Sequence, residues 1–396
     1  MKVVWLVNNL VPYHVARFAQ FSKDFKGESY LVQVTDKDEF EVLQVDSSVG
    51  EFNLHTLYPG TDRKAICSKE LKKTVYEYFD ILKPDCVCVS GWGMEIGLIS
   101  QSWALKNKIP TVMFSVSTEI DEQRVWYKEY IKKNLVKSVS SYFCGGLAQK
   151  AYLEILGADK ELITTGHNVV DTTHFQSSGP NKRDVDDYGS YYVACTRFGK
   201  KKNIFSLIES YSKYSELCKS RCIEPYKLII AGDGELRPKI EMLIEDLDVR
   251  SHVLLLGAVS YKRLPMWYQN AKAFVHVSTS EQWGLVVNEA MAAGAPVIVS
   301  ERCGCSLDLV KVNQNGFTVN PFSNEDIATK LLEFHELPQA KKDEFSNKSR
   351  EIISNWTPKR FSSGLSNAVE IASSLEPKGH SIFTRFLFLL LFTKKW

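Results

Sequence analysis

Short apolar runs alternate with longer amphipathic stretches along the first half of the chain. The apolar runs are continuous, which is typical of strands that are buried on both faces of a parallel sheet. The runs that predict strands are 3–7, 30–34, 85–89 and 110–114. The stretches that predict helices are 12–21, 69–82, 94–106 and 124–138. This order of elements predicts a doubly wound α/β domain.

A polar segment at 176–189, which contains Gly, Pro and several charges, interrupts the pattern and predicts a linker. The alternation then starts again. The second set of predicted strands is 191–195, 227–231, 253–256, 273–277 and 296–299. The second set of predicted helices is 203–217, 236–247, 264–270 and 285–293.

We therefore expect two Rossmann-like α/β domains of similar size, at 1–175 and 190–355, followed by a helix at 356–375 and a tail at 376–396. Ligands of open α/β sheets bind at the carboxyl ends of the strands. A two-domain arrangement of this kind favours a site in the cleft between the domains.

The composition narrows the class of ligand. The 49 Lys and Arg residues nearly balance the 47 Asp and Glu residues, and the net charge is +2. Such a balance argues against a nucleic-acid-binding protein, so an anionic ligand must be met by local positive charge. The nine cysteines show no paired spacing typical of zinc sites, and we interpret them as free thiols of a reducing compartment.

The most informative stretch, 278–304, runs from a predicted strand through a helix into the next strand. Backbone N–H groups at a helix N-terminus can bind a phosphate, and Gly284 would let a ligand approach closely. Glu281 before the helix and Glu289 about one turn into it can both accept hydrogen bonds from the hydroxyl groups of one ligand. Taken alone, two such glutamates are more often solvated surface residues.

The surrounding sequence favours the ligand interpretation, because it resembles a known family. Glu281 and Glu289, Trp283-Gly284-Leu285 between them, and the run NEAMAAGAPV at 288–297 resemble the retaining glycosyltransferases of family 4, which have the GT-B fold. Weaker matches follow in the family's order. They are CTRF at 195–198 with Lys202, AGDG at 231–234, GAV at 257–259, and NVVD with His174-Phe175 at 168–175.

The resemblance implies a nucleoside-diphosphate sugar as donor and a reaction that retains the anomeric configuration. It implies that Arg197 and Lys202 stabilise the leaving diphosphate and that Glu281 binds the donor sugar, with no metal or other cofactor. It also implies that Glu289 binds the ribose. The other implied donor-binding residues are Trp283, Gly284, Leu285, Gly232, Asp233 and Val259. The helix at 356–375 is implied to return to the first domain.

The residues themselves allow the same chemistry. Arg197 and Lys202 follow the end of a predicted strand, and a guanidinium with an ammonium group suits a diphosphate. The alternative is that they are solvated members of a Lys-rich loop. The turn at 232–234 is not a full G-x-G-x-x-G, so a nicotinamide cofactor is not supported. We interpret the Asp-x-Asp triplets, at 36–38, 184–186 and 246–248, as solvated surface.

The first domain departs from the family pattern. The segment 8–12 stands where many members have a Gly pair, and 115–119 stands where many have a histidine. His14 and Glu119 are the candidates for contacts with the acceptor. A structural or surface role is the alternative for both of them, and we expect His167 to be structural.

Two segments suggest contact with an anionic membrane. The first is the basic, aromatic helical pattern around 128–137, for which a solvated lysine face is the alternative. The second is the tail at 381–396, whose apolar run at 386–392 must dock on a membrane, a partner or its own domain; we favour the membrane. No segment reaches the roughly 20 apolar residues of a membrane span, and no secretory signal is visible.

These patterns lead to one leading hypothesis. The chain is expected to transfer a sugar from a nucleotide sugar, with a UDP-sugar as the expected donor, to a glycan or lipid-linked glycan in cell-surface polysaccharide or lipopolysaccharide assembly, at the inner face of the cytoplasmic membrane. The alternatives are a nucleotide-sugar epimerase or hydrolase of the same fold, or a non-catalytic sugar-binding or scaffold protein.

Overall fold

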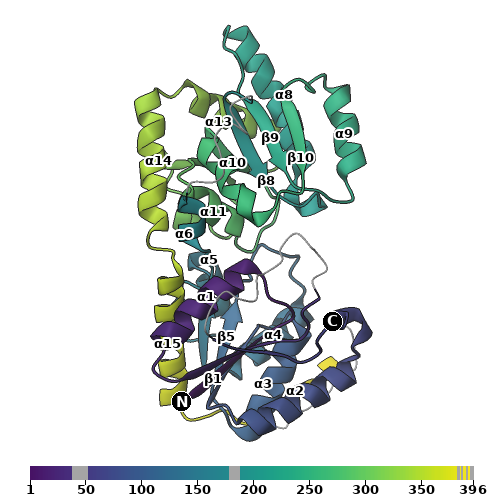
Figure 1. The fold of residues 1–396 in the computed structure, drawn as a ribbon, viewed down its shortest axis with the longest axis vertical. Coiled ribbons are helices and arrows are strands. Elements are labelled where there is room, and N and C mark those ends of the chain that lie inside the picture. Colours follow the sequence, from purple (N-terminus) through teal and green to yellow (C-terminus); the bar gives the residue numbers. More distant parts are fainter. Residues whose placement is uncertain (38–51, 178–187, 381–383, 385–386, 389–390, 393–396) are drawn as a thin grey trace. The chain divides into compact units, whose positions relative to one another are not determined.

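The computed structural model describes residues 1–37, 52–177, 188–380, 384, 387–388 and 391–392 (Figure 1). The chain divides into two compact units. The first unit comprises Met1–Glu119, Gln123–Val169 and Pro358–Trp396, and the second comprises Ile120–Glu122 and Val170–Thr357. Most of the predicted linker and most of the predicted tail lie outside the described residues.

The first unit is built on a parallel sheet. Among its described residues the strand order is β3-β2-β1-β4-β5-β6-β7. The strands are β1 (Lys2–Val7), β2 (Glu28–Gln33), β3 (Asn53–Thr56), β4 (Cys86–Val89), β5 (Thr111–Ser115), β6 (Ser141–Cys144) and β7 (Ile163–Thr165). The helices are α1 (Pro12–Asp24), α2 (Ser68–Leu82), α3 (Glu95–Asn107), α4 (Trp126–Lys137), α5 (Leu147–Ile155) and α15 (Pro358–Ser374).

The second unit repeats this architecture. Its described strands are all parallel and follow the order β10-β9-β8-β11-β12-β13. The strands are β8 (Tyr191–Cys195), β9 (Lys227–Ala231), β10 (Val253–Gly257), β11 (Ala273–His276), β12 (Val297–Ser300) and β13 (Gly316–Val319). The helices are α6 (Thr172–Gln176), α8 (Ile204–Ser220), α9 (Arg237–Asp246), α10 (Leu264–Asn270), α11 (Leu285–Ala292), α12 (Ser306–Leu309), α13 (Asn324–Glu336) and α14 (Gln339–Ile353).

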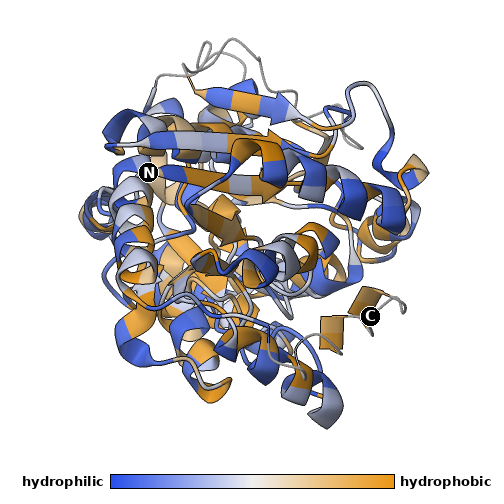
Figure 2. Cartoon of the chain, turned by 90° about the horizontal axis from the view of Figure 1, so that it is seen from below, coloured by the Kyte–Doolittle hydropathy of each residue, from blue (hydrophilic) through white to orange (hydrophobic). Residues whose placement is uncertain are grey.

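The strands form where the sequence is continuously apolar, because both faces of each sheet are covered by helices. The inner strands β4 and β12 are buried along their whole length. Figure 2 shows hydrophobic residues concentrated in the interior and hydrophilic residues along the outer sides of the helices. All the predicted strands and helices are present, with ends shifted by a few residues, and two parallel-sheet α/β units are confirmed.

The boundary between the units falls earlier than the predicted residue 175. The second unit resumes at Val170, because the short helix α6 packs against α10 and α11. The helix α15 belongs to the first unit, where it packs against α1 and the strands β5, β6 and β7. Ser141 Oγ donates a hydrogen bond of 2.7 Å to the carbonyl oxygen of Ala368, which ties α15 to β6.

The described part of the apolar tail packs on its own domain. Leu387, Phe388 and Leu391 are buried in the hydrophobic core of the first unit. The apolar run at 386–392 was expected to dock on a membrane, a partner or its own domain. Its described residues pack on its own domain, and not on the membrane that we favoured. Once buried, these side chains have no apolar surface left to offer a bilayer. None of the described helices is long and apolar enough to span a membrane.

Candidate functional site

The candidate site lies where the order of the second sheet reverses. β8 lies between β9 and β11. After β8 the chain continues to β9 on one side of the sheet, and after β11 it continues to β12 on the other side. Ligands of doubly wound sheets bind at such a switch point, beside the carboxyl ends of the two strands. The loops that follow these two ends carry Thr196–Lys202 and Ser278–Glu281.

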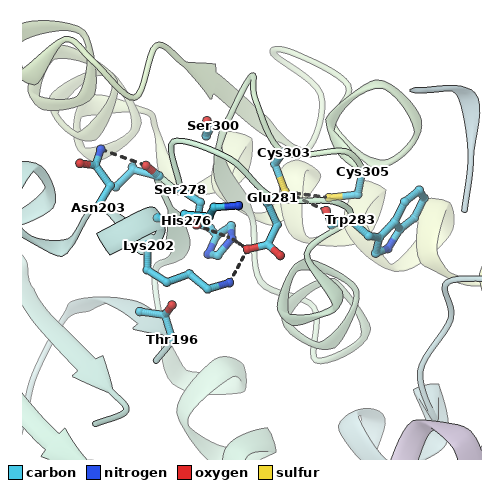
Figure 3. Close-up of polar contacts among 12 residues, drawn as sticks. Thr196, Lys202, Asn203, His276, Ser278, Glu281, Trp283, Ser300, Cys303 and Cys305 are labelled. Atoms are coloured by element: carbon cyan, nitrogen blue, oxygen red, sulfur yellow. Dashed lines mark hydrogen bonds and ion pairs between the residues drawn. The ribbon is translucent and has the colours of Figure 1, made fainter. Parts of the chain in front are cut away.

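Lys202 and Glu281 meet at this edge. The Lys202 ammonium donates a hydrogen bond to Oε2 of Glu281 and forms an ion pair with it (Figure 3). Burial alone would raise the pKa of Glu281, but His276 and Lys202 outweigh it and lower the pKa to about 2. The carboxylate is therefore ionised and can act only as an acceptor.

A pocket of about 290 Å³ opens beside this ion pair. Its lining residues all belong to the second unit and are mostly charged or polar: Asp121, Glu122, Lys201, Lys202, Ser280, Glu281 and Gln282. Within it, the side-chain amide of Gln282 donates a hydrogen bond of 3.0 Å to Asp121. A pocket with this lining suits a hydroxyl-rich, charged ligand better than an apolar one.

The position of Lys202 depends on the next residue. Asn203 has a left-handed backbone with φ of 58° at the start of α8. Its side-chain amide donates to the carbonyl oxygens of Val277, at 3.1 Å, and Pro321, at 2.7 Å. Asn203 thus fastens the lysine-bearing loop to the end of β11.

The start of α11 is shaped by Gly284, which has a left-handed φ of 98°. A Cβ atom at this position would lie 2.7 Å from the sulfur of Cys303, so only glycine fits. The neighbouring Trp283 is buried, and its indole N–H donates to Asn288 at 2.8 Å. The indole is therefore part of the core. The predicted ligand contacts at 283–285 concern the backbone N–H groups and not this side chain.

Glu289 lies in the second turn of α11. Its Oε2 accepts a hydrogen bond of 3.0 Å from the hydroxyl of Tyr268 on α10. Burial raises the pKa of Glu289 to about 7, and the bond from Tyr268 offsets only part of that effect. The carboxyl group is thus ready to change its protonation state near neutral pH.

The loops after β8, β9 and β10 are joined together. Gly232 donates through its N–H to the carbonyl oxygen of Gly257 at 2.7 Å, and a Cβ atom on it would collide with the carbonyl of Thr196. Asp233 forms an ion pair of 3.2 Å with Arg237. Two further residues of the predicted donor site, Arg197 and Val259, also lie at this edge of the sheet. Arg197 is exposed and Val259 is partly buried.

The two predicted acceptor-side residues lie in the first unit. His14 packs edge-on against Trp5, with the ring centroids 5.3 Å apart, and burial lowers its pKa well below the usual value. Glu119 is exposed, and its carbonyl oxygen accepts a hydrogen bond of 2.7 Å from Arg124. His167 is buried beside Phe114 and Phe361, and burial lowers its pKa to about 3.

The structure adds two site residues that the sequence did not indicate. His276 is the last residue of β11 and lies beside Glu281. Cys303 donates from its thiol to the Trp283 carbonyl at 2.8 Å and closes the loop before α11. Only weak indications of these two residues are present in the sequence. His276 is a histidine at the end of an otherwise apolar strand, and Cys303 is a cysteine that follows the apolar strand β12.

Sequence comparison identifies the part of the chain that carries this site. Residues 180–352 match the family described as "Glycosyl transferases group 1". This match covers less than half of the chain.

The chain is also similar in sequence to parts of several curated glycosyltransferases and related enzymes. The chain is 31% identical over 156 residues to alpha-monoglucosyldiacylglycerol synthase of Acholeplasma laidlawii, which covers 39% of this chain and 36% of that protein. It is 23% identical over 243 residues to the O-antigen chain mannosyltransferase RfbU of Salmonella typhimurium, covering 59% and 64%. The chain thus matches less than two thirds of either relative.

The fold resemblance extends beyond residues 180–352. The structure of Anabaena Alr3699/HepE in complex with UDP-glucose aligns with a TM-score of 0.73 at 18% identity, covering 95% of this chain and 100% of that one. The predicted fold class, with two Rossmann-like α/β domains as in GT-B proteins, is confirmed.

Proposed function

We propose that this protein is a retaining glycosyltransferase of family 4 that moves a sugar from a nucleoside-diphosphate sugar, most simply a UDP-sugar, to a glycan or lipid-linked glycan of the cell surface. The observation that carries the proposal is the Lys202–Glu281 ion pair beside a polar pocket at the switch point. A cation for the diphosphate and an ionised acceptor for sugar hydroxyls are the two groups that such a donor requires.

Each donor group has a proposed partner. Arg197 and Lys202 bind the diphosphate and stabilise the charge that develops as it leaves, without a metal ion. Glu281, with the backbone N–H groups of 283–285, binds hydroxyls of the sugar. Glu289 accepts from the ribose hydroxyls, while Gly232, Asp233 and Val259 lie along the nucleotide.

The donor is supported by the solved relative, because Alr3699/HepE was crystallised with UDP-glucose. The acceptor class is supported by the curated relatives, whose names refer to a diacylglycerol glycolipid and to an O-antigen chain. We propose His14 and Glu119 as the acceptor-side residues of the first unit.

The test of the reaction is product analysis with labelled UDP-glucose and a panel of other nucleotide sugars, with and without a lipid-linked glycan acceptor. We expect acceptor-dependent transfer with the anomeric configuration of the donor, unaffected by EDTA and lost in Glu281→Ala. Epimerised sugar or rapid hydrolysis without acceptor would instead show one of the alternative enzymes. Full transfer by Glu281→Ala would exclude the proposed site.

We also propose that α4 docks the enzyme on the inner face of an anionic membrane. Trp126, Tyr127 and Tyr130 are 80%, 48% and 55% exposed, and Lys133 is exposed beside them. Lys132 does not contribute, because it is buried and pairs with Glu129 at 2.9 Å. Aromatic and basic groups on one helix favour the lipid interface.

Liposome flotation tests this contact. Trp126→Ser combined with Lys133→Glu should reduce flotation on anionic vesicles, and raised salt should act in the same direction. Deletion of 381–396 is the comparison, since the described apolar residues of the tail are buried. Flotation that depends only on the tail would show that α4 is not the docking element.

A further inference from the structure

A buried histidine stands behind the ion pair of the candidate site. His276 is 4% exposed at the end of β11, whereas the side chains of Lys202 and Glu281 are 29% and 19% exposed. Histidines are seldom buried next to a carboxylate and a lysine without a reason, because each charge must be compensated.

His276 contacts the loop that follows β11, Ser278–Glu281. Its Nε2 lies 3.1 Å from Oγ of Ser278 and 3.5 Å from Oε2 of Glu281. This is the same carboxylate oxygen that accepts from Lys202 (Figure 3). One oxygen of Glu281 therefore lies between two basic groups, one on a partly exposed lysine side chain and the other buried in the core.

Other groups also face the imidazole. On β11 itself, Phe274 stacks with the ring at 6.1 Å between centroids. The Cys303 thiol comes from the loop after β12, and the sulfur of Cys305 lies 3.6 Å beyond it. Burial lowers the pKa of His276, but its hydrogen bonds with Cys303 and Glu281 outweigh burial and raise the pKa to about 8.

Donor binding would change this arrangement. The inference rests on the proposed function, in which Lys202 turns to the diphosphate. Lys202 then no longer neutralises Glu281, and a half-buried carboxylate that loses its counter-ion tends to take up a proton. A protonated Glu281 would be a weaker acceptor for the hydroxyls of the sugar.

We propose that His276 is a positioning residue that holds Glu281 ionised and oriented toward the donor sugar while Lys202 binds the diphosphate. Its ring is fixed by burial, by Ser278 and by the stacked Phe274, so it cannot follow Lys202 to the ligand. His276 acts on the sugar only through Glu281 and makes no contact with the diphosphate.

A double-mutant cycle on binding tests this role. The affinities of UDP-glucose and of UDP are measured by calorimetry for wild type, His276→Gln, Glu281→Gln and the double variant. His276→Gln should weaken UDP-glucose binding by about ten-fold and leave UDP binding within about two-fold, because only the sugar contacts Glu281. In the Glu281→Gln background the same change should have almost no further effect.

His335→Gln is the matched control. His335 is a partly buried histidine of the same unit, which hydrogen-bonds to Tyr214 at 2.7 Å and stacks on Tyr226 away from the site. Its replacement should lower stability and leave the UDP-glucose to UDP affinity ratio unchanged. Equal losses of UDP and UDP-glucose in His276→Gln, or additive losses in the cycle, would reduce His276 to a structural residue and overturn the proposal.

NMR titration of the imidazole in the ligand-free protein separates this inference from the proposed function. The pKa of His276 should lie above that of His335 and should fall in Glu281→Gln. If the wild type binds none of the nucleotide sugars tested, the proposed function fails, and the titration then decides about His276 by itself. A His276 pKa that does not respond to Glu281→Gln would overturn the pairing.

Discussion

The charges of individual side chains decide what the site can bind. Glu281 and Glu289 were both predicted from the sequence, yet their surroundings push their pKa values in opposite directions. Glu281 lies between Lys202 and His276, and its pKa falls to about 2. Glu289 is partly buried and accepts a hydrogen bond from Tyr268, and burial raises its pKa to about 7. Spacing could place the two glutamates near one ligand but could not show this difference, because His276 and Tyr268 come from distant segments.

Binding of UDP-glucose should therefore become stronger as the pH rises through neutrality. A raised pKa in the free protein means that Glu289 is protonated below about pH 7 and must lose the proton to accept both ribose hydroxyls well. Calorimetry between about pH 6 and about pH 8 should show about ten-fold tighter binding at the upper end. Glu289→Gln should remove the dependence, and an unchanged slope in this variant would assign it to another group.

Gly284→Ala should destabilise the second unit by about 2–4 kcal/mol, because alanine adds a contact with Cys303 to the strain of a left-handed backbone. Gly189→Ala provides the control, since Gly189 has a φ of 67° and no atom within 4 Å of its would-be Cβ. Urea unfolding should show about 1 kcal/mol for the control. Similar losses in both variants would mean that the contact with Cys303 is not important.

At the level of secondary-structure elements, prediction succeeded for the continuously apolar strands and for most of the helices that alternate with them, but the strand β13 and the long helices α13 and α14 were not predicted. The helices α2 and α3 and the strands β1 and β8 were found, since their periodicity or hydrophobicity extends over several residues. The short strands β3, β6 and β7 were missed, because three or four residues carry little pattern and these include Asn, Ser, His and Thr. Their pairing with neighbouring strands, which local sequence does not encode, makes them part of the sheet.

The turn between Lys202 and α8 can be tested as an element. Asn203→Gly keeps the left-handed backbone available but removes two hydrogen bonds, so we expect a loss of about 2 kcal/mol in unfolding free energy. Asn203→Ala adds the backbone strain and should cost about 3 kcal/mol. Urea unfolding measures both, and equal losses in the two variants would show that the backbone conformation contributes nothing.

At the level of the whole molecule, the length of the chain and the repeated pattern indicated two domains, but not the residues at which they divide. Two α/β domains were predicted from the break at 176–189. In the structure, the chain passes from the first unit to the second after Val169 and returns to the first unit after Thr357. The helix α6 packs with the second unit although it precedes the polar segment. Packing between distant elements therefore decides the boundary, and local composition does not reveal it.

The helix α15 should support the first unit alone. Leu365 on its inner face is completely buried, and Leu365→Ala should cost about 2–4 kcal/mol. Hydrogen exchange should show faster exchange in β5, β6 and β7 and unchanged exchange in the second sheet. Glu370→Ala, on the exposed side of the same helix, should remain within about 0.5 kcal/mol of wild type. Equal loosening of both sheets by Leu365→Ala would show that the units do not unfold separately.

The discontinuity of the first unit has a consequence for biosynthesis. The second unit is almost continuous, from Val170 to Thr357, and emerges from the ribosome before α15 is made. It can therefore mature while the N-terminal sheet still has the apolar seat of α15 uncovered, including Phe143 and Trp5 beside Phe361. On the nascent chain this apolar surface stays exposed until α15 is made, and it is covered only when that helix packs against the sheet.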